Sequence, residues 1–350
     1  MLAELVDHVI GVDPDRDRIT AVLIDAATKG EVDQIEAAAT PAGYRSVLDW
    51  ADVWSTAEGR VWSIEGAGSY GAGLCATLQT EGEWVVEFDH PEARSDKDGA
   101  KSDGLDAARA ARELLGRSRY STPRSRGRRE ALRVLMVARR GAQHARVSAI
   151  NELKALIVTA PVQLRQQLRG STVTVLIDRC SRFRVAVGSD AELGGTKQAM
   201  RFLARRVVAL TGEVKAIDAE LSRIVTDMAP QLLDEFGVGP VTAAQVIISW
   251  YHPGRCRNEA AFARLAGTAP LPANSGQTQD RHRLSRGGDR YLNRALHTIV
   301  LTRARSHPAT RAYLARKTSE GKTAREARRC LKRYLARRLY RLLENPPQTT

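Results

Sequence analysis

Alternating hydrophobic and polar positions dominate the first 90 residues and predict short β-strands. From His8 the runs HVIGVD, RITAVLID and EVDQIEA predict three strands, the last two joined by a turn at residues 28–30. The runs RVWSIE at 60–65 and WVVEF at 84–88 predict two more. Helical patterns begin at Pro41 and cover residues 71–80 and 103–115. Hairpins followed by strand-helix units predict an α/β domain, with a mixed sheet and helices on its faces.

Helical periodicity replaces this pattern from about residue 126 onward. One amphipathic stretch ends at Pro161, and a second carries a strict 3,4 apolar repeat over residues 200–228. This heptad repeat is typical of a coiled coil, and its seam either packs against the first helix of the same chain or pairs with a second chain. Residues 172–187 show no pattern that predicts a helix or a strand. We therefore expect an α-helical coiled coil followed by a mainly α-helical C-terminal part.

Two glycines interrupt the helical pattern between residues 232 and 247. Gly237 and Gly239 predict a tight hairpin between two helices, and Pro240 suits the first turn of the second helix. The segment resembles the helix-hairpin-helix motif, whose loop amides hold a nucleic-acid phosphate. A short helical junction with no partner has the same sequence pattern. The last predicted helix, residues 323–342, is dense in Arg and Lys, which favours a phosphate-backbone contact over a calmodulin-target or membrane-surface role.

Charge divides the chain more sharply than hydrophobicity does. The 350 residues, enough for two or three domains, carry a formal net charge of +14. Residues 1–120 have a net charge of −11, residues 121–250 of +9 and residues 251–350 of +16. A basic body behind an acidic head indicates a polyanionic partner. Together with the periodicity, this predicts three regions: 1–120, 121–230 and 231–350.

The sequence also indicates where the protein works. It has no run of about 18 apolar residues to span a bilayer, and its first residues lack the basic region and cleavage site of a secretory signal. The four cysteines are too widely spaced for a metal-binding pair, and a disulfide framework is not expected at this length. These features predict a cytoplasmic protein with no membrane partner.

Four acidic residues of the first region fall at the edges of predicted elements. Asp13 ends the first strand, Glu65 ends the fourth, and Asp103 and Asp106 lie three apart in the first turn of a helix. Gathered at one sheet edge, four carboxylates would repel one another unless cations lay between them. Oxygen ligands of this kind suit Mg²⁺, with Mn²⁺ possible, and two such ions can clamp a phosphodiester.

Each of these acids also has a structural explanation. Asp103 could cap its helix, and Asp13, followed by Pro14, could belong to a turn with Asp15 and Asp17 as solvated neighbours. The ordered set, with each member at an element edge, favours the metal site.

A second candidate site lies in the last region. Ser275 occupies the turn former Asn274-Ser275-Gly276, and it is followed by basic residues predicted to bind nucleic acid: Arg281, Arg283, Arg286 and Arg290. A serine that attacks a phosphate needs guanidiniums to stabilise charge and a base or metal to take its proton. Loop serines are usually turn formers, and Ser285 is a rival candidate that could equally cap a helix.

These motifs, in this order, resemble those of a known family. GVD with Asp13, SIEGAGSYG with Glu65, KSDGLDAARAA with Asp103 and Asp106, the heptads, FGVGPVTA, and LAGTAPLPANSG followed by LSRGGDRYLNRAL are similar to the DEDD transposases of the insertion-sequence-110 family. The resemblance covers nearly the whole chain. It implies an N-terminal RNase-H-like, RuvC-like domain, a coiled coil, and a C-terminal domain that carries an essential serine.

The resemblance further implies a mechanism and partners. Members of the family recombine mobile DNA, guided by a bridge RNA whose loops pair with donor and target DNA. They act as tetramers, as dimers of dimers, with the acids of one protomer beside the serine of another. By carry-over, Asp13, Glu65, Asp103 and Asp106 would bind Mg²⁺, and Ser275 would form a phosphoserine intermediate.

Two other functions remain open on the sequence. A RuvC-like Holliday-junction resolvase or nuclease would use the four acids with a metal-activated water and leave Ser275 idle. A non-catalytic RNA- or DNA-binding scaffold would use the basic body alone, with the acids as helix caps and solvated side chains.

Overall fold

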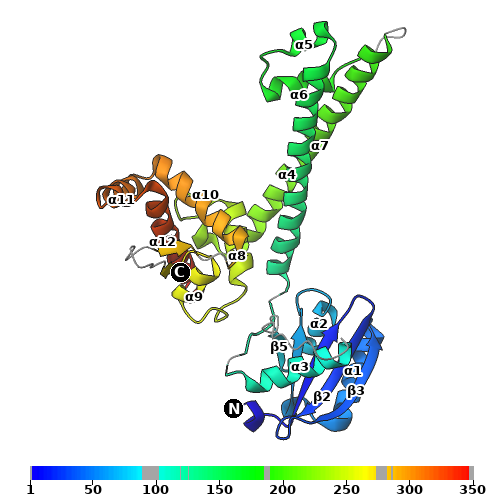
Figure 1. The fold of residues 1–350 in the computed structure, drawn as a ribbon. Coiled ribbons are helices and arrows are strands. Elements are labelled where there is room, and N and C mark those ends of the chain that lie inside the picture. The colour runs from blue at the N-terminus through cyan, green and yellow to red at the C-terminus, as the bar shows by residue number, and fades with distance from the viewer. Residues whose placement is uncertain are drawn as a thin grey trace. The chain divides into compact units, whose positions relative to one another are not determined.

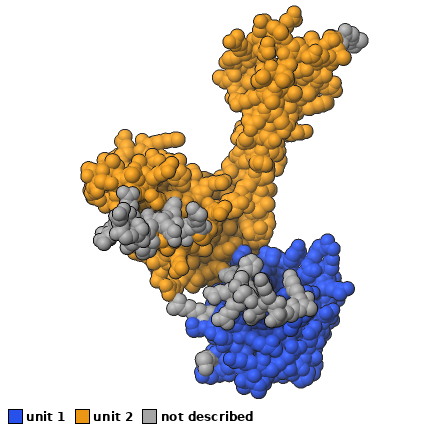
Figure 2. Space-filling model, viewed as in Figure 1, with its two compact units in different colours: residues 1–125 blue, residues 126–350 orange. Residues whose placement is uncertain are grey.

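The computed structural model describes residues 2–88, 102–118, 120–124, 126–184, 190–272, 282–284 and 287–346. The chain forms two compact units, residues 1–125 and 126–350, which Figure 2 shows in different colours. The first unit contains the predicted sheet. The second unit contains the regions predicted over 121–230 and 231–350, except for residues 121–125, which belong to the first unit. The division into three domains stays a prediction.

The first unit follows the element order that the sequence predicts. Its strands are β1 (His8–Pro14), β2 (Arg18–Asp25), β3 (Glu31–Ala38), β4 (Arg60–Glu65) and β5 (Val85–Phe88). Its α-helices are α1 (Pro41–Trp54), α2 (Ala72–Thr80) and α3 (Asp103–Gly116). The strands form one mixed sheet in the order β3-β2-β1-β4-β5. β1 runs antiparallel to β2 and parallel to β4, so the predicted mixed α/β sheet is confirmed.

The sheet, drawn with its helices in Figure 1, buries a core on each face. Ile10, Trp62 and Ile64 belong to the cluster that α1 and α2 complete, whereas Val9 and Val61 belong to the cluster completed by α3. Successive side chains of a strand point to opposite faces, which explains this division. The polar side chains at the strand ends therefore have a defined face.

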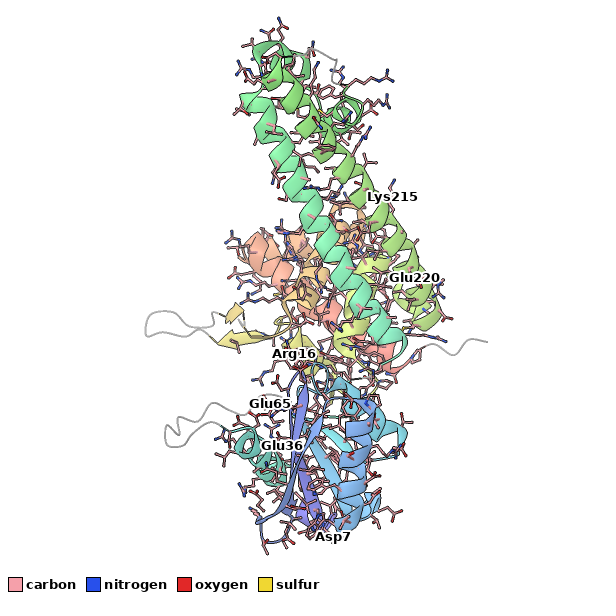
Figure 3. The ribbon with its side chains drawn as sticks, turned by 90° about the vertical axis from the view of Figure 1, so that its right-hand side faces the viewer. Asp7, Arg16, Glu36, Glu65, Lys215 and Glu220 are labelled. Carbon is pink, nitrogen blue, oxygen red and sulfur yellow. The ribbon has the colours of Figure 1, made fainter. Side chains whose placement is uncertain are left out.

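The second unit begins with a long helical hairpin. Its two arms are α4 (Arg128–Thr159) and α7 (Ala191–Met228), joined through α5 (Val162–Leu168) and α6 (Val173–Ser181). Figures 1 and 3 show the arms side by side, and the Arg139–Asp218 ion pair at 2.5 Å joins them. The segment that the sequence left unassigned contains α6.

The heptad repeat of residues 200–228 lies on α7. Its members Met200, Val207, Val214, Leu221 and Ile224 are buried within this chain. α7 packs chiefly on α4. Of the two arrangements open on the sequence, the structure has packing inside one chain. A coiled coil between chains stays a prediction.

The remaining helices form the basic C-terminal part. They are α8 (Pro240–Trp250), α9 (Glu259–Leu265), α10 (Arg290–Ser306), α11 (Pro308–Ser319) and α12 (Ala324–Glu344), with the short antiparallel strands β6 (Pro270–Pro272) and β7 (His282–Leu284). The predicted C-terminal helix is confirmed, and Thr323 caps it in a capping box with Glu326. Across the described ranges, no helix is long and apolar enough to cross a membrane.

Candidate active site

Asp13 and Glu65 lie at the ends of neighbouring parallel strands. The last residues that β1 and β4 pair in register are Val12 and Ile64, and the two acids come directly after them. Adjacent strands run about 4.8 Å apart, so the two backbones present their carboxylates side by side. Both acids are partly buried. The prediction that both lie at one edge of the sheet is therefore confirmed for this pair.

Both carboxylates belong to the sheet face that α3 covers. Two residues before them, Gly11 faces α3, and the Ser63 hydroxyl donates to the Ala110 carbonyl of α3 at 3.0 Å. Because side chains alternate along a strand, Asp13 and Glu65 point to the same side. Figure 3 shows Glu65 at the opposite end of the sheet from Asp7, which precedes β1.

Helix α3 crosses this face along one row of the sheet. Gly104 lies against the Gln34 side chain of β3, and Ala107 lies against Gly11 of β1. The registers place Gln34, Gly11 and Ser63 in a single cross-strand row. The next row toward the strand ends on the same face contains Asp13 and Glu65. The helix thus runs beside the two strand-end carboxylates.

The two acids of α3 differ in their surroundings. Ser102 caps the helix by accepting a hydrogen bond from Leu105 N at 3.3 Å, so Asp103 is not the cap residue. Asp103 is exposed. Asp106 is partly buried and pairs with Arg109 at 2.9 Å. Asp106 directly precedes Ala107, which contacts Gly11 of β1. Along the chain, Asp106 is therefore closer than Asp103 to this contact.

The described side chains do not close into a complete metal cage. Within the ranges that the structure describes, no three His, Cys, Asp or Glu residues are grouped as metal ligands would be. The structure places all four predicted acids on one face of the sheet. It brings Asp13 and Glu65 to adjacent strand ends, with the α3 pair alongside.

The structure also shows where three neighbouring acids lie: Asp15, Asp17 and Glu36. Asp15 and Asp17 lie in the exposed β1–β2 turn, where Asp17 pairs with Arg16 at 2.7 Å and holds the pKa of that guanidinium above its ordinary value. They are turn residues. Glu36 pairs in register with Thr20, the partner of Asp13, and so lies in the same cross-strand row as Asp13. The alternation of side chains along β3 predicts the sheet face of Glu36. Its position in the cross-strand row depends on the register of β3 with β2, which the sequence does not show.

Ser275, Arg281 and Arg286 fall outside the described residues, as does the side chain of Arg283. Arg290, the remaining predicted arginine, is exposed at the first residue of α10. Asp289 caps α10, because its carboxylate accepts hydrogen bonds from Tyr291 N at 2.8 Å and Leu292 N at 3.0 Å.

A buried polar network holds the chain on both sides of the predicted serine segment. Asp289 N donates to the Leu265 carbonyl at 2.7 Å, and Asn293 Nδ2 donates to the Ala266 carbonyl at 2.7 Å. The ammonium of Lys332, which is 6% exposed, donates to Asn293 Oδ1 at 2.8 Å. Burial lowers the pKa of Lys332 below its ordinary value. No local sequence pattern marks Asn293 and Lys332 as partners, because they lie 39 residues apart.

The predicted helix-hairpin-helix segment is formed only in part. α8 begins at Pro240 as expected, but the residues before Gly237 form a short 3₁₀ turn, Pro230–Leu232, and further turns in place of an α-helix. Gly237 has a φ of +83°, as a tight turn requires. The Gly239 amide donates to Thr242 Oγ1 at 3.0 Å. That amide is occupied within the chain, which weakens its predicted role as a phosphate ligand.

Comparison with known families matches both units. Residues 10–160 match a family described as Transposase, of the DEDD type found in IS110 elements. Residues 229–315 match the family described as Transposase IS116/IS110/IS902.

Two curated proteins are similar to parts of the chain. An uncharacterized 43.6 kDa protein of insertion element IS110 from Streptomyces coelicolor is 29% identical over 127 residues, covering 36% of this chain and 31% of that protein. An uncharacterized 42 kDa protein of insertion element IS900 from Mycobacterium paratuberculosis is 28% identical over 178 residues, covering 49% and 43%. The chain thus aligns with less than half the length of either relative.

Proposed function

Since the chain belongs to the IS110 family of transposases, we propose that it is a DNA recombinase of an insertion element, which cleaves and rejoins donor and target DNA. The observation that carries this proposal is the pair Asp13 and Glu65, which end neighbouring parallel strands on the face that α3 covers. The basic second unit supports it, because lysines and arginines supply most of the affinity for a phosphate backbone.

We propose that Asp13, Glu65, Asp103 and Asp106 bind Mg²⁺, with Mn²⁺ as an alternative. The donors fit the ion chemically, because all four offer the hard oxygen ligands that Mg²⁺ prefers. Their shared face supports this, although the described side chains do not form a group of three. A bound Mg²⁺ would stabilise the negative charge that develops on the scissile phosphate. The chain's own part is to hold Asp13 and Glu65 on rigid strands.

The proposed nucleophile is Ser275. Its hydroxyl would attack a DNA phosphate, forming a phosphoserine ester while the broken P–O bond releases a DNA hydroxyl end. Support comes from the family resemblance and from the arginines that follow the serine in sequence, of which Arg290 is exposed.

The proposed partners also follow from the family resemblance. They are a bridge RNA that selects donor and target double-stranded DNA, and further copies of this chain in a tetramer. The net charge of +25 over residues 121–350 supports binding of RNA and DNA. Charge provides affinity but little sequence choice, so a guide RNA would supply the specificity.

Strand cleavage of DNA that carries the element's ends, with the copurifying RNA and Mg²⁺, tests the metal site. We expect Asp13→Asn and Glu65→Gln to lose at least 100-fold in cleavage rate. Asp17→Asn is the matched control, because Asp17 lies in the exposed turn that follows β1. Full activity of Asp13→Asn, or of the wild type in EDTA, would count against the metal site.

Covalent adducts test the nucleophile. With radiolabelled DNA, Ser275→Ala should bind DNA yet give no protein-DNA adduct in denaturing gels, whereas Ser285→Ala should give the adduct normally. If Ser275→Ala still cleaves DNA without an adduct, water is the nucleophile and the RuvC-like nuclease is the better assignment. If no variant or condition gives cleavage while RNA binding persists, the scaffold function is favoured.

A further inference from the structure

The far end of the α4–α7 hairpin forms a small helical body with its own core. We define this body, the tip, as residues 153–206, which include the end of α4, all of α5 and α6, and the start of α7 (Figure 1). Its buried residues form a separate cluster: Leu153, Ala160, Leu164, Leu168, Leu176, Cys180, Met200 and Ala204. Residues 161–228 lie between the two family matches, so neither match assigns a role to most of the tip.

The tip has a strong positive charge for its size. It contains ten Lys and Arg residues against three Asp and Glu residues, a net charge of +7. The rest of α7, residues 207–228, has two basic and four acidic residues, a net charge of −2. The charge therefore changes sign along a single helix. A concentration of this kind is a surface feature, because the tip's core is wholly apolar apart from the Cys180 thiol.

Several arginines along the shaft of the hairpin are paired with carboxylates. Along the shaft of the hairpin, Arg128 pairs with Asp227 at 2.8 Å and Arg139 pairs with Asp218 at 2.5 Å. On α7 itself, Arg223 pairs with Glu220 at 2.6 Å. These pairs hold the two arms together or lie within one arm, and they leave little net charge for a partner.

Arginines of the tip are held by backbone carbonyls instead. Four of them donate to main-chain oxygens at 3.2–3.4 Å: Arg165 to Val158, Arg179 to Gln167, Arg201 to Phe183 and Arg205 to Ser181. Within the described tip, Arg182 with Asp178 at 2.5 Å is the one arginine-carboxylate pair. A carbonyl orients a guanidinium without cancelling its charge, and four further N–H donors remain. These side chains are thus fixed and still charged.

A cavity of 470 Å³ opens between α5 and α6, and of these four arginines only Arg179 lines it. Its lining combines an amide, guanidiniums, a carboxylate and apolar groups: Gln167, Leu168, Asp178, Arg179, Arg182 and Phe183. Unpaired bases are bound by stacking on aromatic rings and guanidinium planes and by hydrogen bonds to their edges. Phe202, which directly follows Arg201, is 54% exposed. The Arg201 guanidinium lies 5.7 Å from the centre of the Phe202 ring.

We infer that the tip binds an unpaired segment of nucleic acid, with phosphates on its arginines and a base in the cavity. The cavity favours an unpaired strand over a duplex, whose bases are stacked inside the helix. A second copy of the tip is a poor occupant, because two bodies of charge +7 repel each other. The inference rests on the proposed function only for the presence of nucleic acid, since binding by the tip requires no catalytic residue.

Fluorescence anisotropy on the full-length protein, freed of nucleic acid, tests this inference. The probes are labelled 20-nucleotide U and dT strands and a 20-base-pair duplex, titrated over a range of salt. The variant is Arg179→Gln with Arg205→Gln. The matched control is Arg128→Gln with Arg223→Gln, which removes the same charge from carboxylate-paired arginines of the shaft.

We expect the tip variant to bind unpaired strands at least fivefold more weakly, while the control changes less than twofold. Loss of two phosphate contacts should reduce the salt slope by about 1.4, at about 0.7 per contact for single strands. The U and dT arms identify whether RNA or DNA is preferred. Equal losses in the variant and the control, or an unchanged affinity, would overturn the inference.

A second variant covers the case in which the first disturbs the tip. Arg169→Glu changes an exposed residue directly after α5, and it should also weaken binding with the helical circular dichroism unchanged. If light scattering shows that either variant dissociates an oligomer while strand affinity stays the same, the tip is a protein interface and the inference is wrong. Because Asp13→Asn and Ser275→Ala leave the tip intact, failure of the proposed recombinase would appear in cleavage and not in this binding.

Discussion

Gly11 of β1 and Ala107 of α3 approach so closely that a side chain at Gly11 has no room. A Cβ built there would lie 1.9 Å from the Ala107 carbonyl oxygen. The contact falls two residues before Asp13 on the strand and one residue after Asp106 on the helix. It therefore fixes how near the helix carboxylates come to the strand-end carboxylates.

Gly11→Ala should push α3 away from the sheet. Because the obstructing atom is backbone, the helix itself must move, and we expect a loss of about 1–3 kcal/mol of unfolding free energy in urea. The proposed Mg²⁺-dependent cleavage should fall with it. Gly116→Ala, at the far end of α3 with nothing within 4 Å, is the control and should cost less than about 0.5 kcal/mol. Equal stability of the two variants would show that the contact is not tight.

Mg²⁺ should stabilise the wild-type protein against heat. A ligand at ten times its Kd adds about 1.4 kcal/mol to the folded state, which raises the unfolding midpoint by about 3 °C. Asp13→Asn should lose this increment, whereas Asp17→Asn should keep it, because Asp17 lies in the exposed turn. Scanning fluorimetry with and without Mg²⁺ measures the shift. The same shift in Asp13→Asn would exclude Asp13 as a ligand.

Glu83→Ala should strongly destabilise the first unit. Glu83 accepts hydrogen bonds from Arg60 Nε at 3.0 Å and Trp62 Nε1 at 2.6 Å in a site from which water is excluded. Its removal leaves the Arg60 charge buried with only part of its partners, at a cost of about 3–5 kcal/mol. Glu81→Ala breaks the exposed pair with Arg45 and should cost less than about 1 kcal/mol. Urea unfolding compares the two, and similar costs would refute the argument.

Leu221→Ala tests the packing of the heptad repeat. Leu221 is 0% exposed within the single chain, so truncation should cost about 2–5 kcal/mol at any protein concentration. Val208→Ala, on the same helix but 54% exposed, should cost less than about 0.5 kcal/mol. A loss for Leu221→Ala that depends on protein concentration would instead assign the repeat to an interface between chains.

Alkaline pH should weaken the tip through Cys180. Burial raises the pKa of its thiol from an ordinary 9.0 to about 11. Between these values the folded state keeps a proton that the unfolded state has lost, so stability falls as pH rises, by about 1 kcal/mol per pH unit. Below pH 9 the thiol has no such effect. Urea unfolding from pH 8 to 11 should show a steeper decline for the wild type than for Cys180→Ala, and parallel curves would contradict the assignment.

Much of the first unit could be predicted because its strands carry their own signals. β-branched runs and alternating apolar positions predicted all five strands, although Ser102 and not Asp103 caps α3. The strand-end position of Asp13 and Glu65 follows from the predicted ends of the first and fourth strands. Glu36 could not be placed in their row, because the row depends on how β3 aligns with β2.

The second unit was less predictable because its chemistry depends on distant contacts. The heptad repeat shows that α7 has a partner but not which one, and the structure has α4 in that place. In the sequence, Lys332 is one of many basic residues of the last helix. In the structure, it is buried and donates a hydrogen bond to Asn293. The positive charge of the tip becomes apparent in the composition only once the structure shows which residues form the end of the hairpin.

The sequence by itself determined the strands and helices of the first unit, the charge division and the identity of the four acids, because periodicity and residue type are local properties of the chain. Only the tertiary structure decided which acids are neighbours, which arginines have a carboxylate partner, and which helix covers the heptad repeat. Those outcomes depend on strand register and on packing between residues far apart in sequence. The approach of Ala107 to Gly11, which brings α3 beside Asp13 and Glu65, is the clearest case.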